Sequence, residues 1–114
     1  MHILINKKYL IYKNYKAKCA IGKRGIGYKK KEGDLITPRG KYKIKFILYR
    51  KDRVKKIQSK IKKIEIKKNI GWCNDINSKQ YYNKPVEVSS KLKHEKLYRH
   101  DYKYDYFIPI KYNW

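Results

Sequence analysis

The segment that most constrains the fold is a rigid loop, residues 33–40, that leads directly into an alternating strand. Pro38 fixes its own φ angle and directs Thr37 toward an extended conformation. Gly40 can adopt a φ angle that a residue with a side chain tolerates poorly. Residues 41–46 then alternate between Lys and an apolar residue, the pattern of a strand with one buried face. The loop therefore delivers the chain into a strand at a fixed angle. Its structural residues are Gly33, Asp34, Thr37, Pro38 and Gly40.

Short alternating or apolar segments, separated by turn residues, continue along most of the chain. They predict a hairpin over residues 3–12 that turns at 6–8. Further strands are predicted at residues 16–21, 41–49, 63–67, 86–88 and 104–110. Loops are predicted at residues 22–27 and 71–78. Many short strands of this kind indicate a mainly β protein with one small core.

Two segments predict helical structure instead. Apolar residues spaced by 3, 4 and 3 positions favour an amphipathic helix, and they are Val54, Ile57, Ile61 and Ile64. We expect a helical or irregular insertion there that ends near Lys62, and one helical turn within residues 92–99. The predicted class is therefore mainly β with one or two short helical segments, in a chain whose 114 residues suit a single domain.

The formal net charge of +23 suggests a basic nucleic-acid-binding domain. However, no recognised nucleic-acid-binding motif accompanies the charge. Lys greatly outnumbers Arg and occurs with much Ile, Tyr and Asn, a composition that A- and T-rich codons produce without selection for a basic surface. We therefore expect no specific nucleic-acid partner. We do expect a salt-sensitive attraction to anionic polymers, cell-wall carboxylates included.

The two cysteines, Cys19 and Cys73, are too few and too far apart for a zinc site. They can form one disulfide in an oxidising compartment or remain two partly buried thiols. No carboxylate cluster suggests a metal ion, and we expect no cofactor. The first residues contain only a three-residue apolar run, which predicts neither a signal peptide nor a membrane span.

Five motifs, in order along the chain, resemble one branch of the L,D-transpeptidase catalytic domain family, the YkuD-like family. The pattern Gly-Asp-x-x-Thr-Pro-x-Gly-x-Tyr at residues 33–42 resembles the early part of that domain. The other four motifs are Cys19-Ala-Ile-Gly-Lys-Arg-Gly25, Gly71-Trp-Cys-Asn-Asp75, Tyr82-Asn-Lys-Pro-Val86 and His94-Glu-Lys-Leu-Tyr98. The resemblance covers nearly the whole chain and implies a β-sandwich of short strands.

The resemblance also implies an activity, peptidoglycan L,D-transpeptidation in the cell envelope or periplasm. In that reaction a cysteine thiolate attacks a carbonyl of a tetrapeptide stem, and an amine from another stem resolves the acyl-enzyme. The family's His and Ser/Thr-x-Gly-Cys motif does not occur in these 114 residues, so we expect residues 1–114 to be a catalytic domain truncated before that motif, without catalytic residues. Cys73 with His94 is a less favoured alternative nucleophile pair, because no spacing supports it and structural roles explain both residues.

A substrate groove, if the chain has one, is expected to hold peptidoglycan stem peptides with loop and strand-end residues whose tips form hydrogen bonds. These residues are Trp72, Asn74, Asp75, His94, Tyr112 and Asn113. Each could instead only pack or solvate a loop. The alternative functions are a non-catalytic peptidoglycan-binding module on the same scaffold and, less favoured, a basic nucleic-acid-binding domain.

Overall fold

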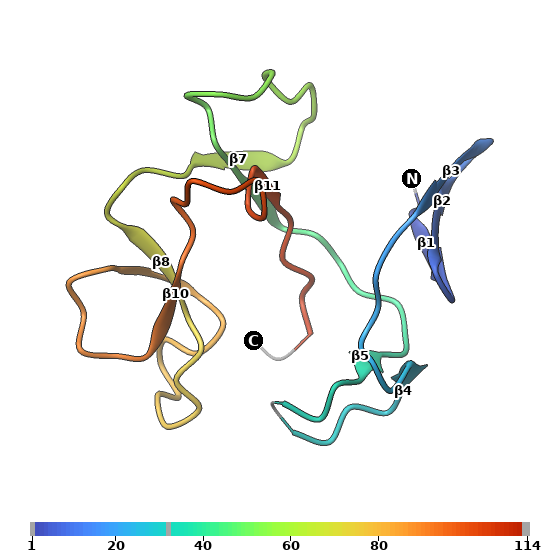
Figure 1. The fold of residues 1–114 in the computed structure, drawn as a ribbon, viewed down its shortest axis with the longest axis horizontal. Helices are drawn as coiled ribbons and strands as arrows, with labels where there is room; N and C mark the ends of the chain where they lie inside the picture. The colour runs from blue at the N-terminus through green and yellow to red at the C-terminus, as the bar shows by residue number, and fades with distance from the viewer. Residues whose placement is uncertain (1, 32, 113–114) are drawn as a thin grey trace. The chain divides into compact units, whose positions relative to one another are not determined.

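The computed structural model describes residues 2–31 and 33–112, which form eleven short strands and no helix (Figure 1). The prediction of a mainly β chain is confirmed. The chain divides into two compact units, Met1–Lys41 and Tyr42–Trp114. Since the described residues form no helix, they include none long and apolar enough to cross a membrane.

The first unit begins with an antiparallel meander of β1 (Leu4–Asn6), β2 (Tyr9–Tyr12) and β3 (Tyr15–Lys18). The predicted hairpin and its turn are confirmed. Lys7 and Lys13 stand in the two tight turns with φ angles of 54° and 52°, in the left-handed region that such turns use. The strand predicted at residues 16–21 is shorter than expected and begins one residue earlier.

The second half of this unit contains the loop that the sequence singled out. Its residues Thr37–Pro38 form β5, which pairs in parallel with β4 (Ile26–Gly27). A segment predicted to be entirely loop therefore includes a two-residue strand. Among the described residues of this unit only Asp34 is buried. The unit is thus organised around a carboxylate and has no buried apolar side chain in its described part.

One sheet of the second unit has β6 (Phe46–Tyr49) between β7 (Lys62–Glu65), which is parallel to it, and β11 (Tyr106–Phe107), which is antiparallel. An isolated bridge between Ile44 and Ile110 extends the β6–β11 side. The strands predicted at 41–49 and 104–110 are therefore present only in part.

The remaining sheet has the order β10-β8-β9, with β8 at Ile70–Cys73, β9 at Pro85–Glu87 and β10 at His94–Lys96. The prediction of a loop from residue 71 is wrong for 71–73. The helical turn predicted within 92–99 is also wrong, because β10 pairs along the edge of β8 instead. Charged residues are common on edge strands, so a His-Glu-Lys strand fits this position.

Of the two alternatives for residues 54–62, the irregular one is observed. Backbone N–H groups of Arg53 and Val54 donate to the carbonyl of Arg50 at 3.0 Å, which makes a single turn, and no helix continues from it. Ile64 belongs to β7, where it pairs with Leu48. The apolar stripe that favoured a helix is therefore divided between an irregular segment and a strand.

The apolar core of the second unit consists of Leu48, Ile66, Trp72 and Leu97. Aromatic rings surround it: the Trp72 ring meets Phe107 edge-on, with centroids 4.9 Å apart, and Phe46 at 6.4 Å. Burial of these large side chains is the main favourable contribution to the fold of this unit.

Candidate functional site

The antiparallel pair β8–β10 brings together most of the residues that the sequence predicted for a substrate groove. Its register places His94 opposite Cys73 and Glu95 opposite Trp72. Directly opposed side chains lie on the same face of a sheet, and side chains alternate faces along each strand. His94 and Cys73 therefore share one face, while Trp72 and Glu95 share the other.

Trp72 lies on the core face and is only 8% exposed. Its ring contacts Phe46 and Phe107 and belongs to the core cluster. A side chain in this position can support the floor of a binding site, but a ligand at the surface has little access to it.

His94 is half-buried and held by two local features. Its Nδ1 lies 2.8 Å from the carbonyl oxygen of Leu92, and because a carbonyl only accepts, Nδ1 is the protonated donor. The ring also lies close to Gly71, where an added Cβ would come within 2.9 Å of the His94 Cδ2 atom. Gly71 therefore provides the space in which this imidazole packs, and Nε2 is the nitrogen left for other contacts.

Cys73 shares the face of His94 but has no exposed surface. Its N–H donates to the Lys84 carbonyl at 2.9 Å, and its own carbonyl accepts from the Asn83 N–H at 3.0 Å. A nucleophile must reach a substrate carbonyl, which a fully covered thiol cannot do in this conformation. The arrangement thus brings Cys73 and His94 onto one face and gives Cys73 the surroundings of a structural thiol. Both Cys73 and Cys19 are free thiols.

Asn74 and Asp75 follow β8 at its exit. The Asn74 N–H donates to the Lys93 carbonyl at 3.1 Å. The Asp75 carboxylate accepts from the N–H groups of Asn77 at 3.0 Å and Lys93 at 3.4 Å. Asp75 therefore forms a local turn and ties it to the segment before β10, whereas the Asn74 side chain is exposed.

Tyr112 lies near the Ile44–Ile110 bridge, and its ring meets Tyr42 edge-on with centroids 5.5 Å apart. Its N–H donates to the carbonyl of Ile110 at 2.9 Å. Asn113, the last residue predicted for the groove, lies outside the described residues.

The loop at residues 33–40 is held by Asp34. One carboxylate oxygen accepts from Lys29 Nζ at 2.8 Å and from the Ile36 N–H at 3.1 Å, and the other accepts from Lys30 N at 2.8 Å and Lys31 N at 3.2 Å. The bond from Lys29, more than any other contact, lowers the pKa of Asp34 far below its usual range. Four donors on one buried carboxylate make this loop a fixed structure.

The other predicted loop residues have matching roles. The Thr37 hydroxyl accepts from the Gly22 N–H at 2.7 Å, which joins the loop to the preceding glycine-rich turn. Gly33 and Gly40 have φ angles of 82° and 136°, which a residue with a side chain adopts only with strain. Pro38 lies in β5 opposite Gly27. All five residues therefore shape the backbone.

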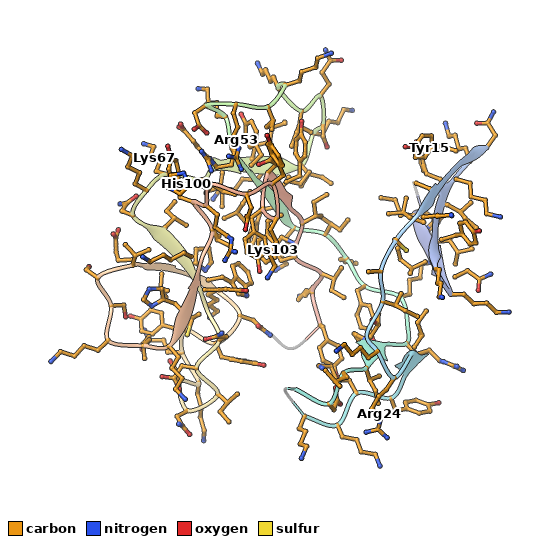
Figure 2. All side chains as sticks on the ribbon, in the orientation of Figure 1. Tyr15, Arg24, Arg53, Lys67, His100 and Lys103 are labelled. Carbon is orange, nitrogen blue, oxygen red and sulfur yellow. The ribbon has the colours of Figure 1, made fainter. Side chains whose placement is uncertain are left out.

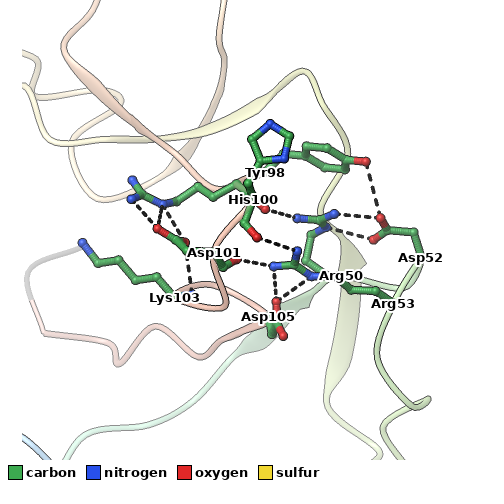
Figure 3. Close-up of polar contacts among 9 residues, drawn as sticks. Arg50, Asp52, Arg53, Tyr98, His100, Asp101, Lys103 and Asp105 are labelled. Atoms are coloured by element: carbon green, nitrogen blue, oxygen red, sulfur yellow. Dashed lines mark hydrogen bonds and ion pairs between the residues drawn. The ribbon is translucent and has the colours of Figure 1, made fainter.

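A cluster of arginine and aspartate side chains joins the turn after β6 to the segment between β10 and β11 (Figure 3). The buried Arg50 guanidinium binds both carboxylate oxygens of Asp52, at 2.9 and 2.8 Å. It also donates to the Arg99 carbonyl at 2.7 Å and stacks 3.7 Å above the centre of the Tyr98 ring. The hydrogen bonds between Arg50 and Asp52 lower the pKa of Asp52 to about 2. The same bonds raise the pKa of Arg50.

Arg53 completes this Arg–Asp cluster (Figure 3). Its Nε donates to Asp105 Oδ1 at 2.8 Å, and its Nη2 donates to the same oxygen and to the Asp101 carbonyl. Nearby, the ion pair from Arg99 at 2.7 Å lowers the pKa of Asp101 to about 2. Sequence analysis missed the cluster, because Arg53 and Asp105 are 52 residues apart and nothing in their spacing indicates contact.

Comparisons with known proteins give no match: no family model, no curated protein and no solved structure corresponds to this chain. Within residues 2–31 and 33–112, no three His, Cys, Asp or Glu side chains gather in a way that could hold a metal ion.

Proposed function

We propose that this chain forms part of a peptidoglycan L,D-transpeptidase, a cysteine acyltransferase of the cell envelope, and that it contributes to holding the stem peptide. The observation that carries the proposal is the β8–β10 pairing. It joins two of the motifs on which the resemblance rests, Gly71–Asp75 and His94–Tyr98, into one structural element with an available imidazole at its surface.

The Arg–Asp cluster gives further support, since it anchors the segment after β10 to the turn after β6 at several points. Substrate-positioning side chains need such rigid backing to hold a peptide in one geometry. The net charge of +23 adds a general attraction to a wall polymer that carries carboxylates.

A non-catalytic peptidoglycan-binding module is the second candidate. One observation favours it: within these 114 residues there is no Ser/Thr-x-Gly-Cys sequence, and Cys73, the cysteine beside a histidine, is fully buried. Both candidates require the same primary event, specific recognition of the stem peptide.

The test is an NMR titration of the ¹⁵N-labelled chain with the tetrapeptide L-alanyl-γ-D-glutamyl-meso-diaminopimelyl-D-alanine. We expect saturable shifts near Trp72, Asp75 and His94, with an affinity that falls by less than about threefold between about 0.15 and 0.5 M NaCl. An oligothymidylate serves as the polyanion control, and its affinity is expected to fall by more than about tenfold over that range.

Absence of saturable binding by the tetrapeptide would contradict both candidates. So would a salt dependence as steep as that of the oligonucleotide, because the attraction would then come from charge alone. Mass spectrometry after incubation tests whether residues 1–114 carry a nucleophile themselves. A covalent adduct on a cysteine would exclude the binding module, whereas binding without an adduct agrees with both candidates.

A further inference from the structure

Three residues of the Tyr82–Val86 motif, Asn83, Lys84 and Pro85, line an open cleft that none of the sequence-predicted site residues occupies. The cleft lies in the second unit and has a volume of about 470 Å³. Its lining comes from β6, β7 and the turn before β9, and the residues used below are Phe46, Lys62, Ile64, Gln80, Asn83 and Lys84.

The floor of the cleft is apolar and firmly supported. Phe46 and Ile64 are both half-buried and pack against the core. Phe46 rests against Trp72, with ring centroids 6.4 Å apart. A ligand on this floor would therefore contact side chains that the core already holds in place.

The rim of the cleft carries positive charge. Lys62 and Lys84 are both exposed, and within the described part of the chain neither ammonium group has an ion-pair partner. Lys62 stands beside Phe46 in the parallel β6–β7 register. Gln80 and Asn83 add amide groups to the same rim.

The Lys84 side of the rim is fixed by backbone hydrogen bonds. Asn83 has a φ angle of 58°, and its N–H donates to the Cys73 carbonyl at 3.0 Å. The Lys84 carbonyl accepts from the Cys73 N–H at 2.9 Å. Asn adopts this left-handed conformation readily in turns, so these bonds simply give the Lys84 side of the rim a fixed backbone shape.

We propose that this cleft binds the carboxylate-bearing end of a short acidic peptide. Lys62 and Lys84 contact the carboxylates, the amides of Gln80 and Asn83 bind the peptide backbone, and Phe46 with Ile64 contacts an apolar side group. An apolar cleft of a few hundred Å³ with a small number of polar groups at its rim is typical of small-ligand sites. The identification of that peptide as a peptidoglycan stem rests on the proposed function.

The shape and charge favour a peptide over a nucleic acid. Nucleic acid binds along a continuous basic track, often with exposed aromatic faces for stacking. Here two lysines flank a single hollow, and the aromatic ring of Phe46 forms its floor. Two separated cations above an apolar floor instead match a short peptide with two carboxylates.

The experiment measures the affinity of the intact chain for three probes by NMR titration at about 0.15 M NaCl. The probes are the stem tetrapeptide, its amidated form without free carboxylates, and N-acetyl-aspartyl-aspartyl-leucine, an acidic peptide unrelated to the cell wall. The variants are Lys62→Met and Lys84→Met. Lys67→Met is the matched control, because Lys67 is an exposed lysine of the same unit outside the cleft (Figure 2).

We expect each cleft variant to weaken binding of both acidic peptides about fivefold, the effect of one exposed charge pair, and Lys67→Met to weaken it less than about twofold. Amidation of the tetrapeptide should cause a similar loss. If the cleft holds the carboxylate-bearing end, the tetrapeptide should shift residues 46, 64 and 80–85 in addition to those near Trp72, Asp75 and His94.

The outcomes separate the two proposals. If the tetrapeptide binds but Lys62→Met and Lys84→Met match the control, the cleft assignment is overturned and the proposed function stands. If only N-acetyl-aspartyl-aspartyl-leucine binds and depends on both lysines, the cleft is an acidic-peptide site and the wall-peptide function fails. If neither acidic peptide binds, or an oligothymidylate competes at this cleft, the inference is wrong.

Discussion

Replacement of Gly22 by Ala is expected to unfold the first unit while leaving the second intact. A Cβ atom at position 22 would lie 2.3 Å from the Leu35 carbonyl oxygen and 2.9 Å from the Thr37 nitrogen. Ordinary contacts between such atoms are about 3.5 Å, so the two backbone segments would have to separate by about 1 Å. These neighbours are backbone atoms, and no rotation of a side chain can relieve the overlap.

The cost can be estimated from the contacts that this separation would break. The Gly22 N–H to Thr37 hydroxyl bond of 2.7 Å and the Arg24 N–H to Leu35 carbonyl bond of 2.9 Å both span the same gap. Each contributes about 1 kcal/mol, and overpacking adds about 1–3 kcal/mol. The total, about 3–5 kcal/mol, is comparable with the few kcal/mol that a unit of this size can have as its stability.

Amide hydrogen exchange measured by NMR gives the stability of each unit separately. In Gly22→Ala, amides such as Arg24 and Thr37 should lose protection. Tryptophan emission comes only from the second unit, because Trp72 and Trp114 both belong to it. This emission should still show a cooperative unfolding transition in Gly22→Ala. Gly27→Ala is the matched control, because its added Cβ would meet nothing closer than a side-chain carbon at 3.9 Å. Wild-type protection in Gly22→Ala would refute the argument, and so would equal losses in both variants.

Three further predictions concern the second unit or its thiol. Leu97→Ala should lower the free energy of unfolding by about 2–5 kcal/mol, because Leu97 is 1% exposed within the core. Urea titration followed by tryptophan emission measures this loss. A loss below about 1 kcal/mol would contradict the core role of Leu97. Asp52 has a pKa of about 2 when folded, against 3.8 for the ordinary group. Its stabilising effect is therefore present above about pH 4 and is lost as the pH falls toward 2. Acid unfolding of Asp52→Asn should consequently show a shallower pH dependence, and an unchanged profile would count against the Arg50 pairing. Cys19, which is partly exposed, should react with a thiol reagent under native conditions, and Cys73 only after unfolding; equal rates would show that Cys73 is accessible.

Local turn chemistry made the loop at residues 33–40 predictable. Pro38 and Gly40 restrict the backbone wherever they occur, so their effect could be inferred without knowledge of any partner. The central role of Asp34 was less evident, although its donors, Lys29 to Lys31 and Ile36, all lie within five residues of it in the sequence. The sequence indicated a turn residue there, and the structure has a buried carboxylate with four donors.

The β8–β10 pair and the Arg–Asp cluster could not be predicted in the same way. His94–Lys96 is a charged segment with little preference for a strand, and its conformation comes from pairing with the buried β8. The Arg50 to Arg99 contact spans 49 residues. Contacts between distant segments depend on the whole fold, whereas the secondary-structure propensity of a residue depends only on its neighbours in the sequence.

The burial of Asp34 in place of an apolar side chain also has a thermal consequence. The heat-capacity increase on unfolding arises from apolar surface that becomes hydrated, and exposure of polar surface lowers it. Since Asp34 is the only buried residue in the described part of the first unit, unfolding of that unit exposes little apolar area. The free energy of unfolding of this unit should therefore be only weakly curved with temperature, with little tendency to cold denaturation. The second unit, with Leu48, Trp72 and Leu97 in its core, should have the more strongly curved profile of an ordinary apolar domain.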